Sequence, residues 1–220
     1  MYSLPKATQL NTSIPKRAIF EKFKLTYRQR QLINDDIARI DIIGRIAEDT
    51  LPAIAVGKEV KVIFVLSISL KRMDYSNESL LLLGRYIPQK MLLVLAYESM
   101  RKLVVIHNGI HASEWVVSEE LKIPLGGLNY DAVWENMVAS IGQISRTEGQ
   151  SLDEGIERKR QEENWNRQIM SLQKKIKSER SLKKQMTYYS EMMEIRKVAE
   201  SELLFKSMKT GDGEDKTNKN

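Results

Sequence analysis

The two histidines of the chain have a spacing that can serve metal chemistry. His107 and His111 are four positions apart, and on a helix that spacing would place both imidazoles on one face, where they could hold zinc. The dipeptide Asn108-Gly109 lies between them and is typical of a turn. The sequence therefore predicts a turn with two incidental histidines, no metal site and no cofactor.

Lysines and arginines form two separated clusters that could bind phosphates. The first 30 residues contain one acid, Glu21, and seven basic residues: Lys6, Lys16, Arg17, Lys22, Lys24, Arg28 and Arg30. Residues 167–184 contain one acid, Glu179, and again seven basic residues: Arg167, Lys174, Lys175, Lys177, Arg180, Lys183 and Lys184. Neutralising phosphates releases counterions, so such clusters favour nucleic-acid binding. A solvated helix face is the plainer alternative.

The sequence lacks the motifs of several common classes of enzyme and binding site. The sequence has no GxxxxGK[ST] or GxGxxG phosphate loop and no GxSxG elbow. The absence of cysteine excludes disulfides, cysteine-ligated zinc and a cysteine nucleophile. No apolar run approaches the roughly 20 residues that span a bilayer, and the opening lacks the apolar segment of a signal peptide. We therefore expect a cytoplasmic protein with no membrane partner.

The elements that position these residues begin with a mixed pattern of helices and strands. The 220 residues are 42% hydrophobic, 29% charged and carry a net charge of +6, enough apolar material for a packed core. We expect an extended N-terminal arm with a helical turn at 16–23, then a helix from Tyr27 begun by the capping-box pair Thr26 and Gln29. Strands follow at 38–46 and 59–72, and strict alternation in the second predicts a central strand.

The following segment continues the sheet and ends in a helix. Ser76 caps a predicted helix at 77–87, and two apolar runs at 91–97 and 102–107 predict a hairpin with a four-residue loop. A short strand is expected around 115–117, or one that continues to 121–123. Asn129 is the expected cap of a helix at 130–142.

The C-terminal part has the composition of charged helices. Four apolar residues follow 4-3-4 spacing, which is typical of a coiled-coil seam: Trp165, Ile169, Leu172 and Ile176. The register then breaks, and a second stripe begins: Leu182, Met186, Tyr189 and Met193. We therefore expect two helices that fold back at 177–181 and pair through these stripes.

These observations predict an α+β fold: a mostly antiparallel sheet flanked by helices, followed by a C-terminal helical hairpin or coiled coil. The expected division is an α+β domain with a basic N-terminal arm at 1–145, a charged helical hairpin at 151–209 and a disordered tail at 210–220. The C-terminal helices could also support an oligomer.

The predicted order of helix, two strands, helix and strand over residues 27–97 resembles the core of the PD-(D/E)xK nucleases. That resemblance implies an acid on the first strand, and a second acid two positions before a lysine, around magnesium. Asp41 matches the first acid and Lys71 the lysine, but Ser69 occupies the position of the second acid. One carboxylate is too few for a dedicated magnesium site, so this alternative implies a degenerate nuclease-like fold.

Three segments resemble an uncharacterised bacterial family, domain-of-unknown-function family 4391. They are the opening with Leu4-Pro5-Lys6, Thr8, Asn11 and Pro15-Lys16, the unit ending IPQKMLLVLAY, and Asn129–Asn136. The resemblance implies an accessory protein found beside helicases and DNA methyltransferases, in restriction-modification-like or phage-defence systems. It implies no catalytic residue. We therefore expect a non-enzymatic subunit that binds a helicase or methyltransferase partner, and also DNA.

Overall fold

The computed structural model describes residues 2–146 and 149–211, and the chain forms two compact units, Met1–Ile144 and Ser145–Asn220. Residues 210 and 211 belong to the last helix. The rest of the predicted tail, 212–220, lies outside the described residues. No helix in the described part of the chain is long and apolar enough to cross a membrane.

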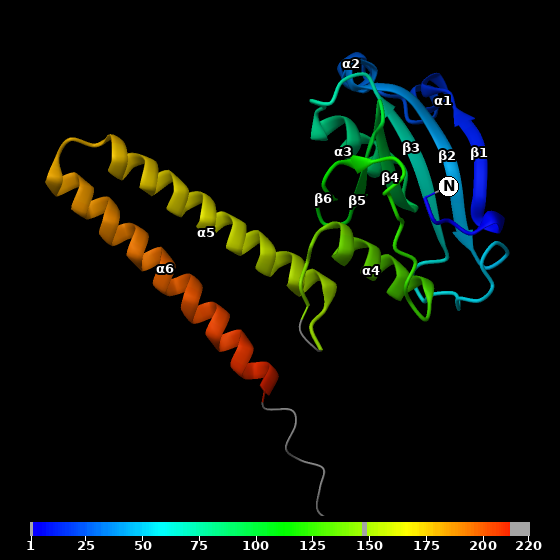
Figure 1. Ribbon diagram of the computed structural model, residues 1–220. Helices are drawn as coiled ribbons and strands as arrows, with labels where there is room; N and C mark the ends of the chain where they lie inside the picture. The colour runs from blue at the N-terminus through cyan, green and yellow to red at the C-terminus, as the bar shows by residue number, and fades with distance from the viewer. Residues whose placement is uncertain (1, 147–148, 212–220) are drawn as a thin grey trace, which may run out of the picture. The chain divides into compact units, whose positions relative to one another are not determined.

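The first unit is built on a seven-stranded sheet with the order β1-β2-β3-β4-β5-β6, in which β7 also pairs with β5 (Figure 1). The strands are β1 (Gln9–Ile14), β2 (Ile37–Ala47), β3 (Val62–Leu70), β4 (Lys90–Tyr97), β5 (Met100–Ile106), β6 (Ile110–Ala112) and β7 (Val116–Val117). β3 and β4 are parallel, and the other pairs are antiparallel. The predicted, mostly antiparallel α+β fold is therefore confirmed, with β3 in a central position.

This unit contains one 3-10 turn and four α-helices, three of which begin at the caps that the sequence predicts. They are the 3-10 turn η1 (Lys6–Thr8), α1 (Lys16–Lys22), α2 (Tyr27–Asp36), α3 (Asn77–Tyr86) and α4 (Tyr130–Ile141). Thr26 and Gln29 form a complete capping box before α2. The side chains of Ser76 and Asn129 accept backbone N–H groups in the first turns of α3 and α4. These bonds satisfy donors that have no partner inside the helix.

Helices cover both faces of the sheet. On one face, Leu66 and Ile68 of β3 share a core with Ile19 of α1, Ile33 of α2 and Leu80 of α3. The other face packs against α4, whose buried residues are Tyr130, Val133, Trp134, Met137, Val138 and Ile141. Lys90, directly opposite Ile63 in the sheet, places its ammonium group 5.3 Å from the Trp134 ring centre. The sheet therefore forms the middle of three layers.

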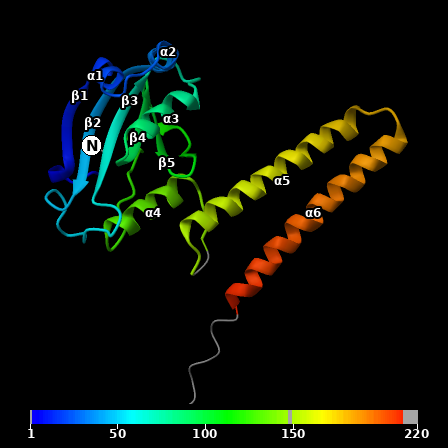
Figure 2. The same ribbon diagram turned by 180° about the vertical axis from the view of Figure 1, so that it is seen from behind.

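Two local features differ from their sequence-based predictions. The N-terminal arm contains β1, which pairs with β2 at the sheet edge (Figure 2). The strands β4 and β5 are joined by two residues, Glu98 and Ser99, because Tyr97 pairs with Met100. The prediction of a four-residue loop is therefore wrong. Glu98 takes a left-handed φ of 47°, which tight hairpin turns require.

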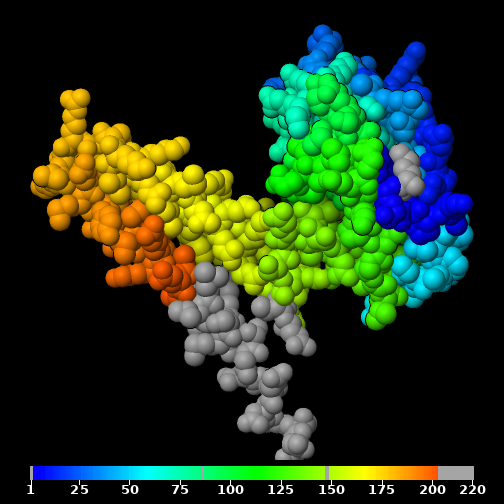
Figure 3. All heavy atoms as spheres, in the orientation of Figure 1, coloured from blue at the N-terminus to red at the C-terminus, as the bar shows by residue number. Residues whose placement is uncertain are grey.

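The second unit contains α5 (Leu152–Ser178) and α6 (Leu182–Gly211), which pack side by side as the predicted hairpin (Figure 3). Ser151 and Glu154 form a capping box at the start of α5. The reversal lies at 179–181, within the predicted interval. Leu172 is buried and Trp165, Ile169 and Ile176 are half-buried, which agrees with the first predicted seam.

The second predicted stripe is wrong by one residue. Leu182, Met186 and Tyr189 are exposed and Met193 is half-buried. The row that faces α5 has one buried residue, Met192, and four half-buried ones, and its members are Gln185, Tyr188, Met192, Ile195 and Ala199. Their spacing of 3, 4, 3 and 4 residues is that of an antiparallel helix seam. The face that pairs with α5 therefore begins with Gln185, and the more apolar stripe points elsewhere.

Candidate nucleic-acid interface

The tip of the hairpin is a short connection in which the only acid is bound by the backbone. The Glu179 carboxylate accepts the N–H groups of Arg180 at 2.9 Å and Ser181 at 3.0 Å. These bonds, that of Ser181 first, hold the pKa of Glu179 below its ordinary value, and the charge of Lys184 adds to the effect. The side chain of Gln185 donates to the Glu179 carbonyl at 2.6 Å. Glu179 therefore stabilises the turn and the start of α6.

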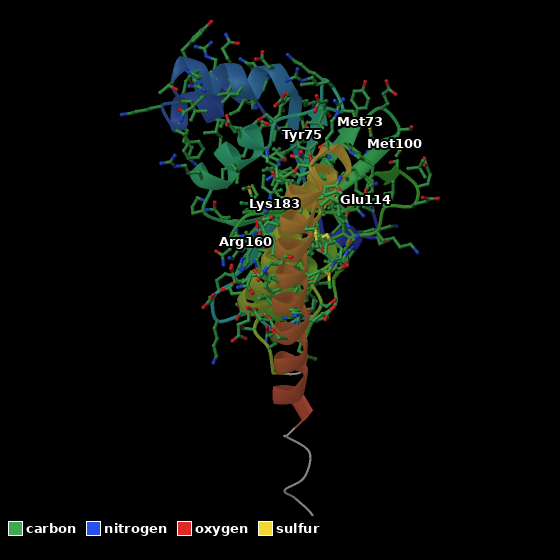
Figure 4. The ribbon with its side chains drawn as sticks, turned by 90° about the vertical axis from the view of Figure 1, so that its left-hand side faces the viewer. Met73, Tyr75, Met100, Glu114, Arg160 and Lys183 are labelled. Carbon is green, nitrogen blue, oxygen red and sulfur yellow. The ribbon has the colours of Figure 1, made fainter. Side chains whose placement is uncertain are left out.

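Six basic side chains surround this turn, and all of them are exposed: Lys174, Lys175, Lys177, Arg180, Lys183 and Lys184. We call this set the basic tip. The Lys175 ammonium lies 5.6 Å from the centre of the Tyr188 ring, a cation–π contact that leaves its charge in place. Lys183 is in the first turn of α6 (Figure 4). Arg167 is exposed but lies about 16 Å from the end of α5, as 1.5 Å per residue requires.

The opposite end of α5 has a different charge pattern. There, three basic residues pair with acids one turn away: Arg158 with Glu162, Lys159 with Glu163, and Arg160 with Glu157. Figure 4 labels Arg160 on this part of the helix. Interleaved signs are the usual state of a solvated helix face. The basic tip has no such pairing within the described residues, which makes it the more strongly charged part of the hairpin.

Several basic residues of the N-terminal cluster contact other residues of the same unit. The Arg17 side chain bonds to Glu21 at 2.7 Å, and that of Arg30 donates to the Leu25 carbonyl at 2.8 Å. Lys22 lies over the Phe23 ring at 5.6 Å. The remaining three are exposed and come from different elements: Lys6 in η1, Lys24 after α1 and Arg28 in α2. The N-terminal cluster is thus less uniform than the basic tip.

Lys16 points into the first unit. Its ammonium group donates to the carbonyl of Ile37 at 2.8 Å, which links the start of α1 to the start of β2. Partial burial lowers the pKa of Lys16, and the nearby positive charge of Lys71 lowers it further. Lys71 lies just after β3, and its backbone N–H donates to the Asp36 carbonyl at 2.8 Å. Lys16 and Lys71 therefore lie near one another, although 55 positions separate them in the sequence.

The residues of the nuclease alternative lie on neighbouring strands. Asp41 of β2 is opposite Ser67 of β3, and Ser69 is opposite Arg39 one row further along. The Asp41 side chain is 12% exposed and accepts a hydrogen bond from Arg39 at 2.7 Å. Among the described residues, no group of three histidines, cysteines or acids could hold a metal ion. Sequence reasoning did not identify Ser67, which the strand register brings opposite Asp41, or Arg39, which strand alternation places on the same face two positions before Asp41.

The two histidines lie at the turn between β5 and β6. A ring nitrogen of His111 is 2.9 Å from the His107 carbonyl, and the Trp134 indole N–H donates to His107 at 3.4 Å. The His107 and Trp134 rings meet edge to face, with their centres 6.2 Å apart. These contacts tie the turn to α4, and the predicted turn is confirmed.

The segments that carry the family resemblance are held by backbone contacts. Thr8 is fully buried and donates to the Pro5 carbonyl at 2.8 Å. In the segment Asn129–Asn136, Asn136 donates to the Gly126 carbonyl, and the Asp131 carboxylate accepts N–H groups of residues 58–60. Tyr130 is buried and donates to the Leu51 carbonyl at 3.0 Å. These residues therefore hold loops of the first unit in place.

Comparison with known proteins gives one match. The family model described as "Domain of unknown function (DUF4391)" matches residues 3–198. No curated protein and no solved structure matches the chain.

Proposed function

Because the chain belongs to the DUF4391 family, we propose that it is a non-enzymatic accessory subunit of a bacterial DNA-transaction system. In this proposal the protein works in the cytoplasm, in a restriction-modification-like or phage-defence system. It binds nucleic acid through the basic tip, and a helicase or DNA methyltransferase is its protein partner.

The basic tip is the observation that carries the proposal. Six exposed cations surround one acid whose carboxylate is occupied by backbone N–H groups. Lys183 and Lys184 stand in the first turn of α6, where the positive end of the helix dipole repels them. Local stability therefore does not account for Lys183, whereas Lys184 also attracts the Glu179 carboxylate. A phosphate backbone would reverse the cost, since the helix terminus and the lysines attract the same anion.

A salt series tests this function directly. Labelled duplex DNA would be titrated with the full chain and with a variant that carries Lys174, Lys175, Lys183 and Lys184→Glu. We expect the slope of log affinity against log salt to fall in magnitude by up to about 3.6 in the variant, because each lost phosphate contact contributes about 0.9. Two exposed lysines of the first unit that belong to neither basic cluster serve as the control, Lys58 and Lys122→Glu.

Two outcomes would contradict nucleic-acid binding at the tip. One is unchanged affinity in the four-lysine variant, and the other is no binding by the unmodified chain at low salt. A pull-down from the native host, with and without nuclease treatment, would then separate a direct protein partner from one bridged by DNA.

A degenerate nuclease-like enzyme is the second candidate. It is favoured by the observed order of α2, β2, β3, α3 and β4, which is the order expected of that core, and by the shielded position of Asp41. The ion pair with Arg39 and the serines at 67 and 69 leave Asp41 as the one acid in this part of the sheet. Magnesium needs more oxygen ligands than that, so we prefer the binding function.

A further inference from the structure

The outer surface of α6 carries a row of apolar side chains that the hairpin does not bury. Leu182 is 76% exposed, Met186 71% and Tyr189 55%, and the half-buried Met193 continues the row. Their spacing of 4, 3 and 4 residues keeps them on one side of the helix. We call these four residues the exposed stripe. Single exposed apolar residues are common in proteins, but a continuous row is typical of an interaction surface.

The exposed stripe is separate from the seam that joins the two helices. Met186, Tyr189 and Met193 each follow directly after a residue of the buried row, namely Gln185, Tyr188 and Met192. One residue turns an α-helix by about 100°. The exposed stripe therefore lies along the flank of the hairpin, beside the seam.

The neighbouring helix contributes to the same flank. Met170 of α5 is 57% exposed and follows directly after the half-buried Ile169. In two antiparallel helices, the residues one position after the facing row fall on the same side of the pair, because the reversed direction also reverses the sense of rotation. Met170 therefore lies on the flank that carries the exposed stripe, which widens the apolar surface across both helices.

The rim of this flank is basic. The same helical geometry places six charged residues around it, and all of them are exposed: Arg167, Lys174 and Lys177 of α5, and Lys183, Arg196 and Lys197 of α6. Of the nearest acids on α6, Glu191 projects from the other side of the helix, whereas Glu194 lies 11 positions after Lys183 and projects within about 20° of it. Glu194 is thus the one carboxylate at the edge of this flank between Leu182 and Lys197, and there is none between Asn166 and Lys177.

We propose that this flank binds an acidic amphipathic helix of a partner protein. The partner's apolar residues would pack on the exposed stripe and on Met170, and its acids would meet the basic rim. A second copy of the chain fits less well, because its own flank would bring cations against cations. Nucleic acid would use the rim alone and leave the apolar row in water. The inference deepens the proposed function by naming the class of partner.

The test uses a synthetic amphipathic peptide of about 21 residues, six helical turns, with leucine on one face and glutamate on the other. A matched peptide has lysine in place of every glutamate. Fluorescence anisotropy would measure binding of each labelled peptide to the full chain. We expect the acidic peptide to bind and the basic peptide to fail, because the basic rim selects the sign of the charge.

Neutral substitutions separate the apolar contact from charge. Met186→Gln together with Tyr189→Gln should weaken binding of the acidic peptide about tenfold, since two apolar contacts are lost. Val198→Gln is the control, because Val198 is 48% exposed on α6 and lies outside the exposed stripe. Circular dichroism checks that each variant keeps its helix content.

Several outcomes would overturn the proposal. They are equal binding of both peptides, no binding of either, or unchanged affinity in the double variant. Sedimentation of the chain as a dimer that the double variant dissociates would assign the flank to self-association instead. Duplex DNA binding should persist in the double variant, which keeps every cation. Loss of peptide binding and loss of DNA binding therefore report separately on this inference and on the proposed function.

Discussion

The carboxylate of Asp131, in the first turn of α4, accepts the backbone N–H of Val60 at 2.7 Å, across 71 positions of the chain. The same carboxylate accepts the N–H of Lys58 at 2.6 Å and that of Glu59 at 3.2 Å. The bond from Val60 is the main reason why the pKa of Asp131 lies below its ordinary value. One side chain thus fixes the loop that leads into β3.

Replacing Asp131 with alanine should destabilise the first unit by about 2 kcal/mol, because the N–H of the buried Val60 loses its partner. Asp131→Asn keeps one acceptor oxygen and should lose less. Chemical denaturation followed by circular dichroism measures the difference. The exposed Glu120→Ala variant is the control. Equal stability of the alanine variant and the unmodified chain would show that water replaces the carboxylate without cost.

Asp36 should make the first unit sensitive to acid. Its side chain is 2% exposed, and burial alone would raise its pKa. Hydrogen bonds from Arg72, the Ser76 N–H and Ser79 outweigh burial and hold the pKa below 3.8. The bound carboxylate therefore stabilises the folded state above that value, and the contribution is lost as the pH falls through the folded-state pKa.

We expect Asp36→Asn to be less stable than the unmodified chain by about 2–3 kcal/mol near neutral pH. The difference should shrink as the pH falls from about 6 to about 2, because the unmodified chain alone loses the carboxylate contribution. Urea denaturation at a series of pH values measures it. If the difference in free energy of unfolding stays constant over that range, the loss of stability does not come from the charge of Asp36.

The register of the hairpin predicts opposite results for two methionines on α6. Met192 is 5% exposed and Met186 is 71% exposed. Met192→Ala should destabilise the hairpin by about 2–3 kcal/mol, since it leaves a cavity in the seam, whereas Met186→Ala should change stability by less than about 0.5 kcal/mol. Hydrogen exchange of α5 amides reports on the hairpin separately from the sheet. If Met186→Ala destabilised the hairpin more than Met192→Ala, the helices would pair through the row that begins with Leu182.

Charge reversal at the start of α6 should improve stability while it weakens DNA binding. Lys183→Glu replaces a repelled cation by an anion that the helix terminus attracts, for a gain of about 0.3–1 kcal/mol at low salt. Lys184 is left in place because it attracts the Glu179 carboxylate. Thermal denaturation and the DNA titration would be carried out on the same variant. If both stability and affinity fall, Lys183 stabilises the turn itself, and a ligand is not needed to explain its position.

The purified protein should not cleave plasmid DNA in magnesium or manganese. Asp41 is paired with Arg39, and Ser67 and Ser69 supply no carboxylate beside it. Metal-dependent cleavage that disappears in both Asp41→Ala and Lys71→Ala would contradict this prediction and favour the nuclease-like candidate. Cleavage that persists in both variants would indicate a contaminating nuclease.

Much of the fold could be predicted because its signals are local. The alternation in β3, and the capping residues Thr26, Ser76 and Asn129, act within a few positions of themselves. β1 could not be predicted in this way. Leu10, Asn11, Thr12 and Ser13 are all exposed, so this edge strand carries no alternation of buried and exposed residues. Its pairing with β2 depends on main-chain bonds, which leave little trace in side-chain type.

The seam of α6 shows a second limit. Both of its rows have helical spacing, and the exposed stripe is the more apolar of the two. Hydrophobicity alone therefore favours the wrong row. The face that α5 selects includes Gln185, whose side chain reaches the Glu179 carbonyl across the turn. That bond belongs to the folded hairpin and has no signature in the sequence of α6.

The candidate site could be predicted from the sequence only in part. The basic tip follows from the position of the helix break, which the sequence indicates. The inward direction of the Lys16 side chain could not be predicted, because its acceptor, the Ile37 carbonyl, lies 21 positions away on another element. A count of charges treats Lys16 and Lys24 alike, although only contacts between distant segments decide which of them reaches a ligand.

The reach of Asp131 also affects how the first unit forms on the ribosome. A ribosome adds about 5–20 residues per second, so the 71 positions between Val60 and Asp131 take roughly 4–14 s to synthesise. During that interval β2 and β3 have emerged, but the carboxylate that holds their connecting loop has not been made. The apolar face that α4 later covers stays open to solvent or to a chaperone. Completion of this unit therefore waits on translation of a helix near its C-terminal end.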